Sequence, residues 1–289
     1  MRSLAETVAE ALGDQVRHVT PVSGGDTASA FRIDLASGRT VFAKTHPAPP
    51  PGFFTTEAVN LAWLAEPGAV AVPGVRAASD GDAGHPAHLV LDWIDEGPAA
   101  TTTDEELGRA LAELHRAEPA VFGRTDGRTT GSRGLPNDPA PSWAEFYAGQ
   151  RLAPLARLAR DERALAPVAI DALERLDADR LVEVGGPVEP PARLHGDLWA
   201  GNRIVDRAGT SWLIDPAAHG GHREFDLAMM RLFGGFGRAC FVAYDEAWPL
   251  ADGWADRVAL HQIAPLVIHA IKFGASYRAA ATEAITTYT

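Results

Sequence analysis

The feature that most constrains this chain is a run of polar residues in the last third of its 289 residues. The run reads His195-Gly196-Asp197, and Asn202 follows five residues later. Thirteen residues beyond Asn202 comes Asp215, after two short strand-like segments that flank a turn at 206–209. Asp, Gly and Asn are also common in ordinary turns. The spacing to Asn202 and the second carboxylate at the end of a hairpin favour a functional site over a capped loop.

These residue types meet the chemical needs of phosphoryl transfer. That reaction depends mainly on positioning and charge neutralisation, and it uses an acceptor for the substrate hydroxyl's proton and oxygen ligands for magnesium. Asp197 would be the catalytic base, and Asn202 and Asp215 would bind the metal. The order and spacing are typical of the protein-kinase catalytic loop and metal-binding Asp, with His-Gly-Asp in place of His-Arg-Asp. We therefore predict a magnesium-dependent kinase.

Composition excludes several other classes of protein. The chain carries 26 Lys and Arg against 38 Asp and Glu, a formal charge of −12, which is the wrong sign for a general nucleic-acid binder. Its one cysteine, Cys240, excludes an intrachain disulfide and a multi-cysteine metal site. No signal-peptide pattern is present, and no apolar run approaches the roughly 20 residues of a membrane helix. We expect a soluble cytoplasmic protein with no membrane or nucleic-acid partner.

The first part of the chain is predicted to form an antiparallel, β-rich unit. Alternating residues indicate three strands, at 16–22, 28–35 and 40–44. The loop Ser23–Thr27 joins the first two strands, and its Gly24 and Gly25 would cover the nucleotide phosphates. The loop matches neither Walker A nor a full G-x-G-x-x-G, so an ordinary hairpin turn remains the alternative.

Lys44 and Glu57 form the second part of the predicted nucleotide site. Lys44 ends the third strand, where kinase-like proteins place the lysine that binds the α- and β-phosphates. Glu57 lies thirteen residues further on, on the core-facing stripe of a helix predicted at 53–64. A carboxylate on such a stripe is costly to bury unless it is paired, so we expect an ion pair with Lys44. A solvent-facing lysine is the alternative.

A hinge between two lobes is predicted where the apolar strand 87–94 ends. The backbone at this point would face the adenine, through Asp92, Trp93 and Ile94. A plain core strand that ends in a loop fits the same residues. The predicted division is an N-lobe of residues 1–95, which binds the nucleotide phosphates, and a C-lobe of residues 96–289, which carries the catalytic loop and binds metal and substrate.

The remainder of the chain is predicted to be mainly helical. A capping box at Thr103–Glu106 begins a helix that ends near His115, a histidine with no evident partner. A polar segment at 122–141 is too long for a simple connection and indicates a functional or mobile loop. Helical spacing resumes in three further stretches, at 143–158, 168–181 and 260–273, of which the last is the final apolar helix.

Polar residues around the catalytic loop suggest structural roles. The histidines His195, His219 and His222 match no zinc spacing, so a metal site made of them is not expected. Asp226 begins an apolar helix and is a candidate cap. It would also hold the catalytic loop by hydrogen bonds.

With these residues placed, the chain resembles the fructosamine/ketosamine-3-kinase family over nearly its whole length. His-Gly-Asp and the later Asp occur in many small-molecule kinases related to aminoglycoside phosphotransferases, so they indicate only the superfamily. The narrower likeness lies in other motifs: Trp199 within the catalytic loop, Asp215-Pro216-Ala217, Gly221-His222-Arg223-Glu224 with Asp226-Leu227-Ala228, Phe233-Gly234-Gly235-Phe236, Leu135-Pro136-Asn137 and the stretch Gln262 to Tyr277.

The resemblance implies an α+β, two-lobed protein-kinase-like fold and ATP- and Mg²⁺-dependent phosphorylation of the 3-hydroxyl of a ketosamine. The acceptor would be a small-molecule fructosamine or ribulosamine, or a glycated lysine on a protein. The phosphorylated adduct then falls apart, which is a deglycation repair. By this resemblance, Lys44 and Glu57 form the phosphate-binding pair and Asp197 acts as the base. Asn202 and Asp215 bind the magnesium. The candidate substrate residues are His195, Trp199, His222, Arg223 and Glu224.

Two other functions remain open. A phosphotransferase acting on an aminoglycoside or a choline-like amino-alcohol would share the superfamily motifs, and a charge of −12 permits polycationic substrates. A nucleotide-binding pseudokinase would be expected to lack at least one of Lys44, Asp197, Asn202 and Asp215, whereas all four are present. Some family members dimerise through a cysteine in the glycine loop. Ser23–Thr27 has none, so we expect a monomer.

Overall fold

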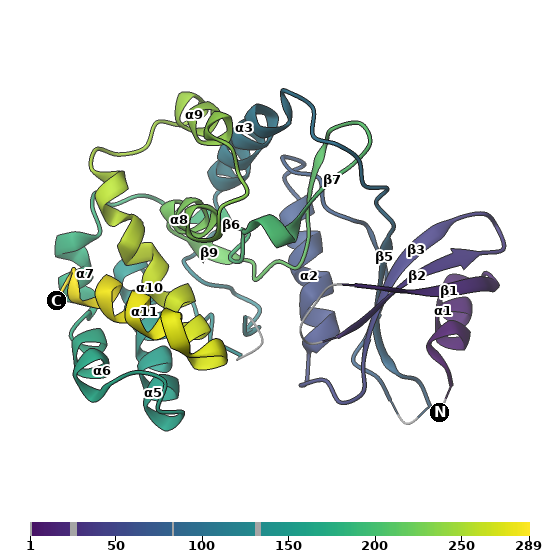
Figure 1. The fold of residues 1–289 in the computed structure, drawn as a ribbon, viewed down its shortest axis with the longest axis horizontal. Coiled ribbons are helices and arrows are strands. Elements are labelled where there is room, and N and C mark those ends of the chain that lie inside the picture. Colours follow the sequence, from purple (N-terminus) through teal and green to yellow (C-terminus); the bar gives the residue numbers. More distant parts are fainter. Residues whose placement is uncertain (1, 24–27, 83, 131–133) are drawn as a thin grey trace. The chain divides into compact units, whose positions relative to one another are not determined.

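The computed structural model describes residues 2–23, 28–82, 84–130 and 134–289. These residues fall into two compact units (Figure 1). Unit 1 comprises Met1–Thr103 and Arg203–Pro216, and unit 2 comprises Asp104–Asn202 and Ala217–Thr289. The predicted glycine loop, with Gly24 and Gly25, lies outside the described residues.

Unit 1 is built on an antiparallel sheet with the strand order β1-β2-β3-β5-β4. The strands predicted at 16–22, 28–35, 40–44 and 87–94 are confirmed to within a few residues at their ends, and β4 is an additional strand. Their bounds are β1 Val16–Val22, β2 Ser29–Leu35, β3 Thr40–His46, β4 Val75–Ser79 and β5 Ala87–Asp92. Because side chains alternate across a strand, this sheet presents one apolar set to each of its faces.

Helix α1, Leu4–Leu12, covers one face of the sheet (Figure 1). It begins with a capping box between Ser3 and Glu6, which satisfies backbone N–H groups of its first turn. It ends at Gly13, whose φ of 61° is a left-handed conformation suited to glycine. Its fully buried Val8 packs against alternate residues of β2, β3 and β5.

Helix α2, Phe53–Ala65, lies on the opposite face of the sheet (Figure 1). Phe54 and Leu61 pack there against Leu89 and Leu91 of β5. The spacing of Phe54 and Leu61 defines the buried stripe of α2, and this stripe carries the first functional side chain described below.

A second short ribbon belongs to unit 1, although it comes late in the sequence. Strands β7, Arg203–Val205, and β8, Ser211–Leu213, pair antiparallel as predicted. Gly97 N donates to Val205 O at 2.9 Å, and Leu213 N donates to Ala71 O at 2.9 Å. Through these main-chain bonds, 96–103 and 203–216 pack with the N-terminal strands as part of unit 1.

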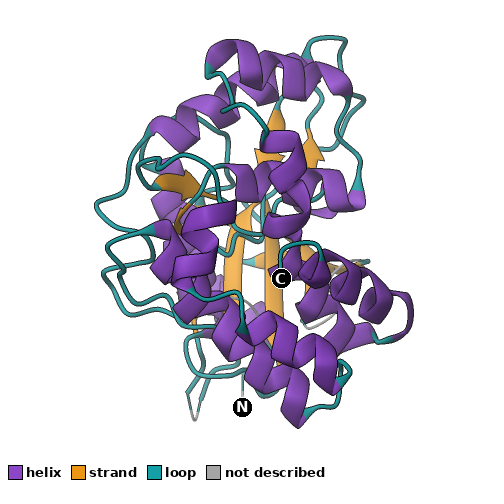
Figure 2. Cartoon of the chain, turned by 90° about the vertical axis from the view of Figure 1, so that its left-hand side faces the viewer, coloured by secondary structure: helices purple, strands orange, loops and turns teal. Residues whose placement is uncertain are grey.

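Unit 2 is mainly helical, and Figure 2 draws the helices of the chain in purple. Strands β6, Ala192–Leu194, and β9, His219–Gly221, pair antiparallel in a two-stranded ribbon. In the sequence, β6 precedes the catalytic loop, residues 195–202, and β9 follows it. A short 3₁₀ turn lies at Ala200–Asn202. The helices are α3 Thr103–Arg116, α4 Trp143–Phe146, α5 Ala153–Asp161, α6 Pro167–Glu174, α7 Ala178–Val184, α8 Glu224–Phe233, α9 Arg238–Ala247, α10 Trp254–Phe273 and α11 Ala275–Thr286.

A π-helical turn, Tyr147–Leu152, joins α4 to α5. The buried Tyr147 hydroxyl donates to Leu260 O at 3.0 Å and accepts from Ala264 N at 3.3 Å. These two groups are an i, i+4 pair in the turn of α10 just before Pro265, whose ring disturbs the preceding turn. Tyr147 therefore supplies a partner where the proline disturbs the backbone bonding of α10.

The C-terminal helices differ from the prediction in two ways. The final apolar helix begins earlier than expected, at Trp254, and a further helix that was not predicted, α11, follows directly after Gly274. The stretch 168–181 is likewise divided, into α6 and α7. Among the described residues, every helix is too short or too polar to cross a membrane. The sheet of unit 1 and the helices of unit 2 confirm the α+β class.

Candidate active site

Lys44 and Glu57 meet inside unit 1. On β3, Val41 and Ala43 pack on the α1 side of the sheet, so Lys44 points to the α2 side. Lys44 Nζ donates to Glu57 Oε1 at 2.9 Å, and each side chain is 15% exposed. The ion pair expected from the spacing is confirmed, and its role in phosphate binding stays a prediction.

Asp215 completes a charged cluster with this pair. Its carboxylate accepts a hydrogen bond from Lys44 Nζ, and its backbone φ of 52° is a left-handed conformation in which Asp is enriched. Burial raises the pKa of Glu57, and the Lys44 ammonium opposes this effect. Burial alone would lower the pKa of Lys44, but the two carboxylates hold it above its usual value. The lysine is therefore charged and shared between two acids.

Asn60 is a residue of this cluster that sequence reasoning missed. It lies one turn after Glu57 on α2 and is 3% exposed. Its Nδ2 donates to Pro216 O at 3.1 Å, which fixes the backbone immediately after Asp215. A polar residue on the apolar stripe was the available signal, because a buried amide requires partners.

The predicted hinge lies beside a cavity within unit 1. The Asp92 side chain is paired with Arg76 at 2.6 Å, and Trp93 Nε1 donates to Asp95 at 3.1 Å. A cavity of about 320 Å³ is lined by residues of the hinge, of the β7–β8 turn and of β8: Asp92, Trp93, Ile94, Asp95, Asp206, Arg207, Ala208 and Trp212. The expected contact between this backbone and adenine stays a prediction.

The carboxylate of Asp226 binds the backbone of the catalytic loop in unit 2. This fully buried carboxylate accepts from His195 N at 2.7 Å and from Gly196 N at 2.9 Å, as predicted. Gly196 has a φ of 79°, and a Cβ there would lie 2.2 Å from Ala217 O. The middle residue of His-Gly-Asp is therefore restricted to glycine by both conformation and space.

Asp197 and Asn202 face one another across the loop. Asn202 Nδ2 donates to Asp197 O at 2.8 Å and to Asp197 Oδ2 at 3.2 Å. His195 is fully buried, and its Nδ1 accepts from Asp197 N at 3.2 Å. Trp199 is 40% exposed, and its ring lies so close over Gly201 that a Cβ there would be 2.3 Å away. The loop thus presents Asp197 and Trp199, whereas His195 supports it from inside.

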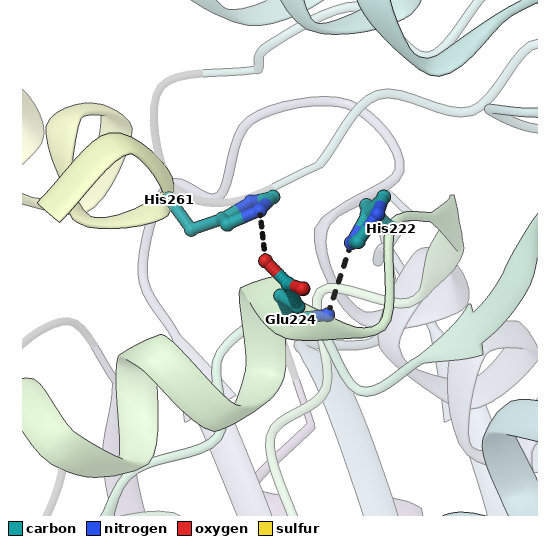
Figure 3. A group of neighbouring side chains, drawn as sticks. All are labelled: His222, Glu224 and His261. Atoms are coloured by element: carbon teal, nitrogen blue, oxygen red, sulfur yellow. Dashed lines mark hydrogen bonds and ion pairs between the residues drawn. The ribbon is translucent and has the colours of Figure 1, made fainter. Parts of the chain in front are cut away.

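His222, Glu224 and His261 form a buried cluster next to β9 (Figure 3). His261 Nε2 lies 3.4 Å from Glu224 Oε2, and the backbone N–H of Glu224 points to His222 Nδ1 at 3.3 Å. Their possible ligand atoms lie within 4.8 Å of one another. However, Arg257 donates to both Glu224 oxygens, at 2.9 and 2.5 Å. With its one carboxylate already neutralised, the cluster is better suited to an ion-pair anchor than to a metal.

Arg223 has a similar internal role. It pairs with Glu189 at 2.7 and 2.8 Å and lies over the Trp248 ring at 4.0 Å. Its exposed fraction is 3%, and those of His222 and Glu224 are 3% and 1%. These three predicted substrate residues are brought together, but they offer almost no surface to a ligand.

Glu224→Gln is expected to lower the free energy of unfolding by about 3–5 kcal/mol, because it leaves the buried Arg257 without its counter-charge. Hydrogen bonds from His261 and Arg257 overcome the effect of burial and lower the pKa of Glu224 to about 2, so the pair is ionised at neutral pH. Urea unfolding measures the loss. The double variant Glu224→Gln/Arg257→Met should recover much of it, and a fully stable single variant would rule out the anchor.

The protein is expected to lose stability as the pH falls below about 6.5. Burial lowers the pKa values of His219 and His222 from 6.5 to about 3. Between these values the unfolded chain binds protons that the folded chain does not, so stability is full above pH 6.5 and declines on acidification. At pH 5 each of these histidines lowers the free energy of unfolding by about 2 kcal/mol relative to neutral pH.

Melting temperatures from pH 7 to pH 5 check this expectation. His222→Gln should flatten the slope of melting temperature against pH, and the exposed His18→Gln should leave it unchanged. Equal slopes for wild type and His222→Gln would contradict the assignment.

The described part of the polar segment 122–141 is ordered by a buried arginine. Arg151 is 3% exposed and donates to Pro136 O at 2.6 Å and to Asn137 Oδ1 at 2.5 Å. Gly123 N donates to Gly220 O of β9 at 2.8 Å. The segment is therefore attached to the ribbon that carries the catalytic loop, rather than being a simple connection.

Two oxygen donors fit the predicted magnesium ligands. Because Asn202 uses its amide nitrogen toward Asp197, its Oδ1 is the group left to coordinate a cation. The Asp215 side chain is 38% exposed and carries a carboxylate. Magnesium prefers such oxygen ligands, so each of the two groups is chemically suited to the metal.

The fold and these side chains define a class of enzyme, the protein-kinase-like phosphotransferases. The solved structure of a protein from Thermobifida fusca, named as a candidate fructosamine-3-kinase, matches with a TM-score of 0.90 at 38% identity. The match covers 99% of this chain and 98% of that one. The two-lobed kinase-like fold expected from the sequence is thereby confirmed.

Within this class, the chain belongs to the fructosamine kinase family, whose sequence model matches residues 1–289. A Lactiplantibacillus plantarum protein named "Probable ketoamine kinase" is 35% identical over 273 residues, which is 94% of this chain and 95% of that protein. The chloroplastic protein-ribulosamine 3-kinase of Arabidopsis thaliana is 31% identical over 288 residues, 96% of this chain and 85% of that protein. The resemblance inferred from the motifs is confirmed.

Proposed function

We propose that this chain transfers the γ-phosphoryl group of ATP to the 3-hydroxyl of a ketosamine, such as a fructosamine or ribulosamine adduct of an amine. The observation that carries the proposal is the family match over the whole chain. The presence of Lys44, Asp197, Asn202 and Asp215 in that chain supports an active enzyme. The phosphorylated adduct then decomposes and frees the amine, so the physiological role is deglycation repair.

In the proposed mechanism each side chain has one task. Asp197 accepts the proton of the acceptor hydroxyl as its oxygen bonds to the γ-phosphorus and the bond to ADP breaks. Lys44, oriented by Glu57, holds the α- and β-phosphates, with Gly24 and Gly25 as their cover. Asn202 and Asp215 would hold Mg²⁺, which would neutralise phosphate charge when bound. The adenine lies against the hinge backbone at Asp92, Trp93 and Ile94.

Substrate contact is assigned to Trp199, whose indole is exposed two residues from Asp197. We assign His195, His222, Arg223 and Glu224 to positioning instead, because these side chains are almost fully buried. The active species is a monomer, and its partner is a small-molecule ketosamine or a glycated lysine on a protein.

The test is Mg²⁺-dependent ATP consumption with ribuloselysine, fructoselysine, an aminoglycoside and choline. Turnover of a ketosamine, with the phosphate placed on the C3 hydroxyl by NMR, is the expected result. Turnover of the aminoglycoside or choline alone would support the assignment as a kinase and overturn the assignment of a ketosamine as its acceptor. No turnover of any acceptor, with intact nucleotide binding, would favour a pseudokinase.

A further inference from the structure

Three buried side chains from three helices of unit 2 form a continuous hydrogen-bonded line. His115, near the end of α3, has its Nε2 3.2 Å from Asp226 Oδ2 and its Nδ1 2.9 Å from the Tyr244 hydroxyl. Tyr244 comes from α9 and Asp226 from α8. All three side chains are fully buried, so solvent cannot substitute for any member of the line.

The proton positions in this line follow from its acceptors. The Asp226 carboxylate is held ionised despite burial, since hydrogen bonding and charge from His115 lower its pKa. An ionised carboxylate only accepts, so His115 must carry its proton on Nε2. Nδ1 pairs with the Tyr244 hydroxyl, which can donate or accept. His115 therefore contacts both neighbours at once, with its Nε2–H directed to Asp226.

We propose that His115, with Tyr244 behind it, is a positioning residue for Asp197. Asp226 already accepts from the backbone N–H groups of His195 and Gly196, one on each oxygen. The Nε2–H of His115 is a third donor to the same carboxylate. It fixes the rotation at which each oxygen faces its own backbone N–H, and thereby sets where the next residue, Asp197, presents its side chain.

If His115 only filled space, a different result would be expected for its substitution. An apolar side chain of similar size would then serve as well, provided that the helices still pack. In the proposed arrangement, loss of the donor lets the Asp226 carboxylate turn and loosens the loop. A base misplaced by about 1 Å costs on the order of 100-fold in rate. The proposal rests on the proposed function for its kinetic readout, but not for its structural one.

The experiment compares His115→Gln, which keeps an N–H donor, with His115→Leu, which does not. His115→Leu is expected to lower kcat by about 10- to 100-fold with an unchanged KM for ATP, and to speed hydrogen exchange at the amides of His195 and Gly196. His115→Gln should restore most of kcat and of the amide protection. The exposed His18→Leu is the control and should change neither.

Other outcomes overturn the proposal or separate it from the proposed function. Equal loss of kcat in the Gln and Leu variants, or unchanged amide exchange in His115→Leu, overturns it. If His115→Leu does not fold, Tyr244→Phe is used, and an unchanged His115 tautomer by ¹⁵N NMR together with unchanged kcat overturns it. If the wild type phosphorylates no ketosamine, the proposed function fails, and amide exchange still decides the role of His115.

Discussion

Asp197→Ala is expected to lower kcat by about 100- to 10,000-fold, the range contributed by a well-placed general base. Nucleotide affinity should be nearly unchanged, because the charged cluster of Lys44, Glu57 and Asp215 is formed within unit 1 and does not include Asp197. Steady-state kinetics with a ketosamine and calorimetric titration of ADP measure the two effects separately.

Asp171→Ala, at an exposed position of α6, is the matched control and should retain full activity. Undiminished turnover of Asp197→Ala would show that another group accepts the hydroxyl proton. Loss of ADP binding in parallel with turnover would mean that Asp197 supports the nucleotide site instead.

Asp215→Ala is expected to weaken Mg²⁺-dependent binding of ADP by roughly 10- to 100-fold or more, the scale on which groups at a metal site affect affinity. Binding without Mg²⁺ should not weaken, because the substitution removes an acceptor from Lys44 and leaves its pairing with Glu57. Titration of ADP with and without Mg²⁺ separates these effects. An equal loss in both conditions would assign Asp215 to orienting Lys44 rather than to holding the metal.

Much of unit 1 could be predicted because its signals are local. The helix carrying Glu57 follows from apolar spacing, and its pairing with Lys44 follows from the cost of an unpaired buried carboxylate. The hold of Asp226 on the catalytic loop was also predictable, since a carboxylate at the start of an apolar helix requires donors. In each case the residue and its need for a partner were visible in a short window of sequence.

The remainder depends on contacts between distant segments. Thr103 was expected to cap its own helix, but its hydroxyl donates to Gly209 O at 2.7 Å and accepts from Ala100 N. His115 lies four residues after Leu111 and so on the buried stripe of α3, yet its partners are 111 and 129 residues away. Helix α11 has only a weak apolar stripe, made of Ala281, Ala284 and Ile285, and a helix of this length depends on its packing, here on α10.

The late position of the β7–β8 ribbon has a consequence for how this chain is made. Residues 104–202 are translated before 203–216, which complete unit 1. At about 5–20 residues per second, this interval lasts roughly 5–20 s. Throughout it the nascent chain carries Lys44 and Glu57 without the Asp215 carboxylate that joins them, so the N-terminal segment cannot reach its final form as it emerges from the ribosome.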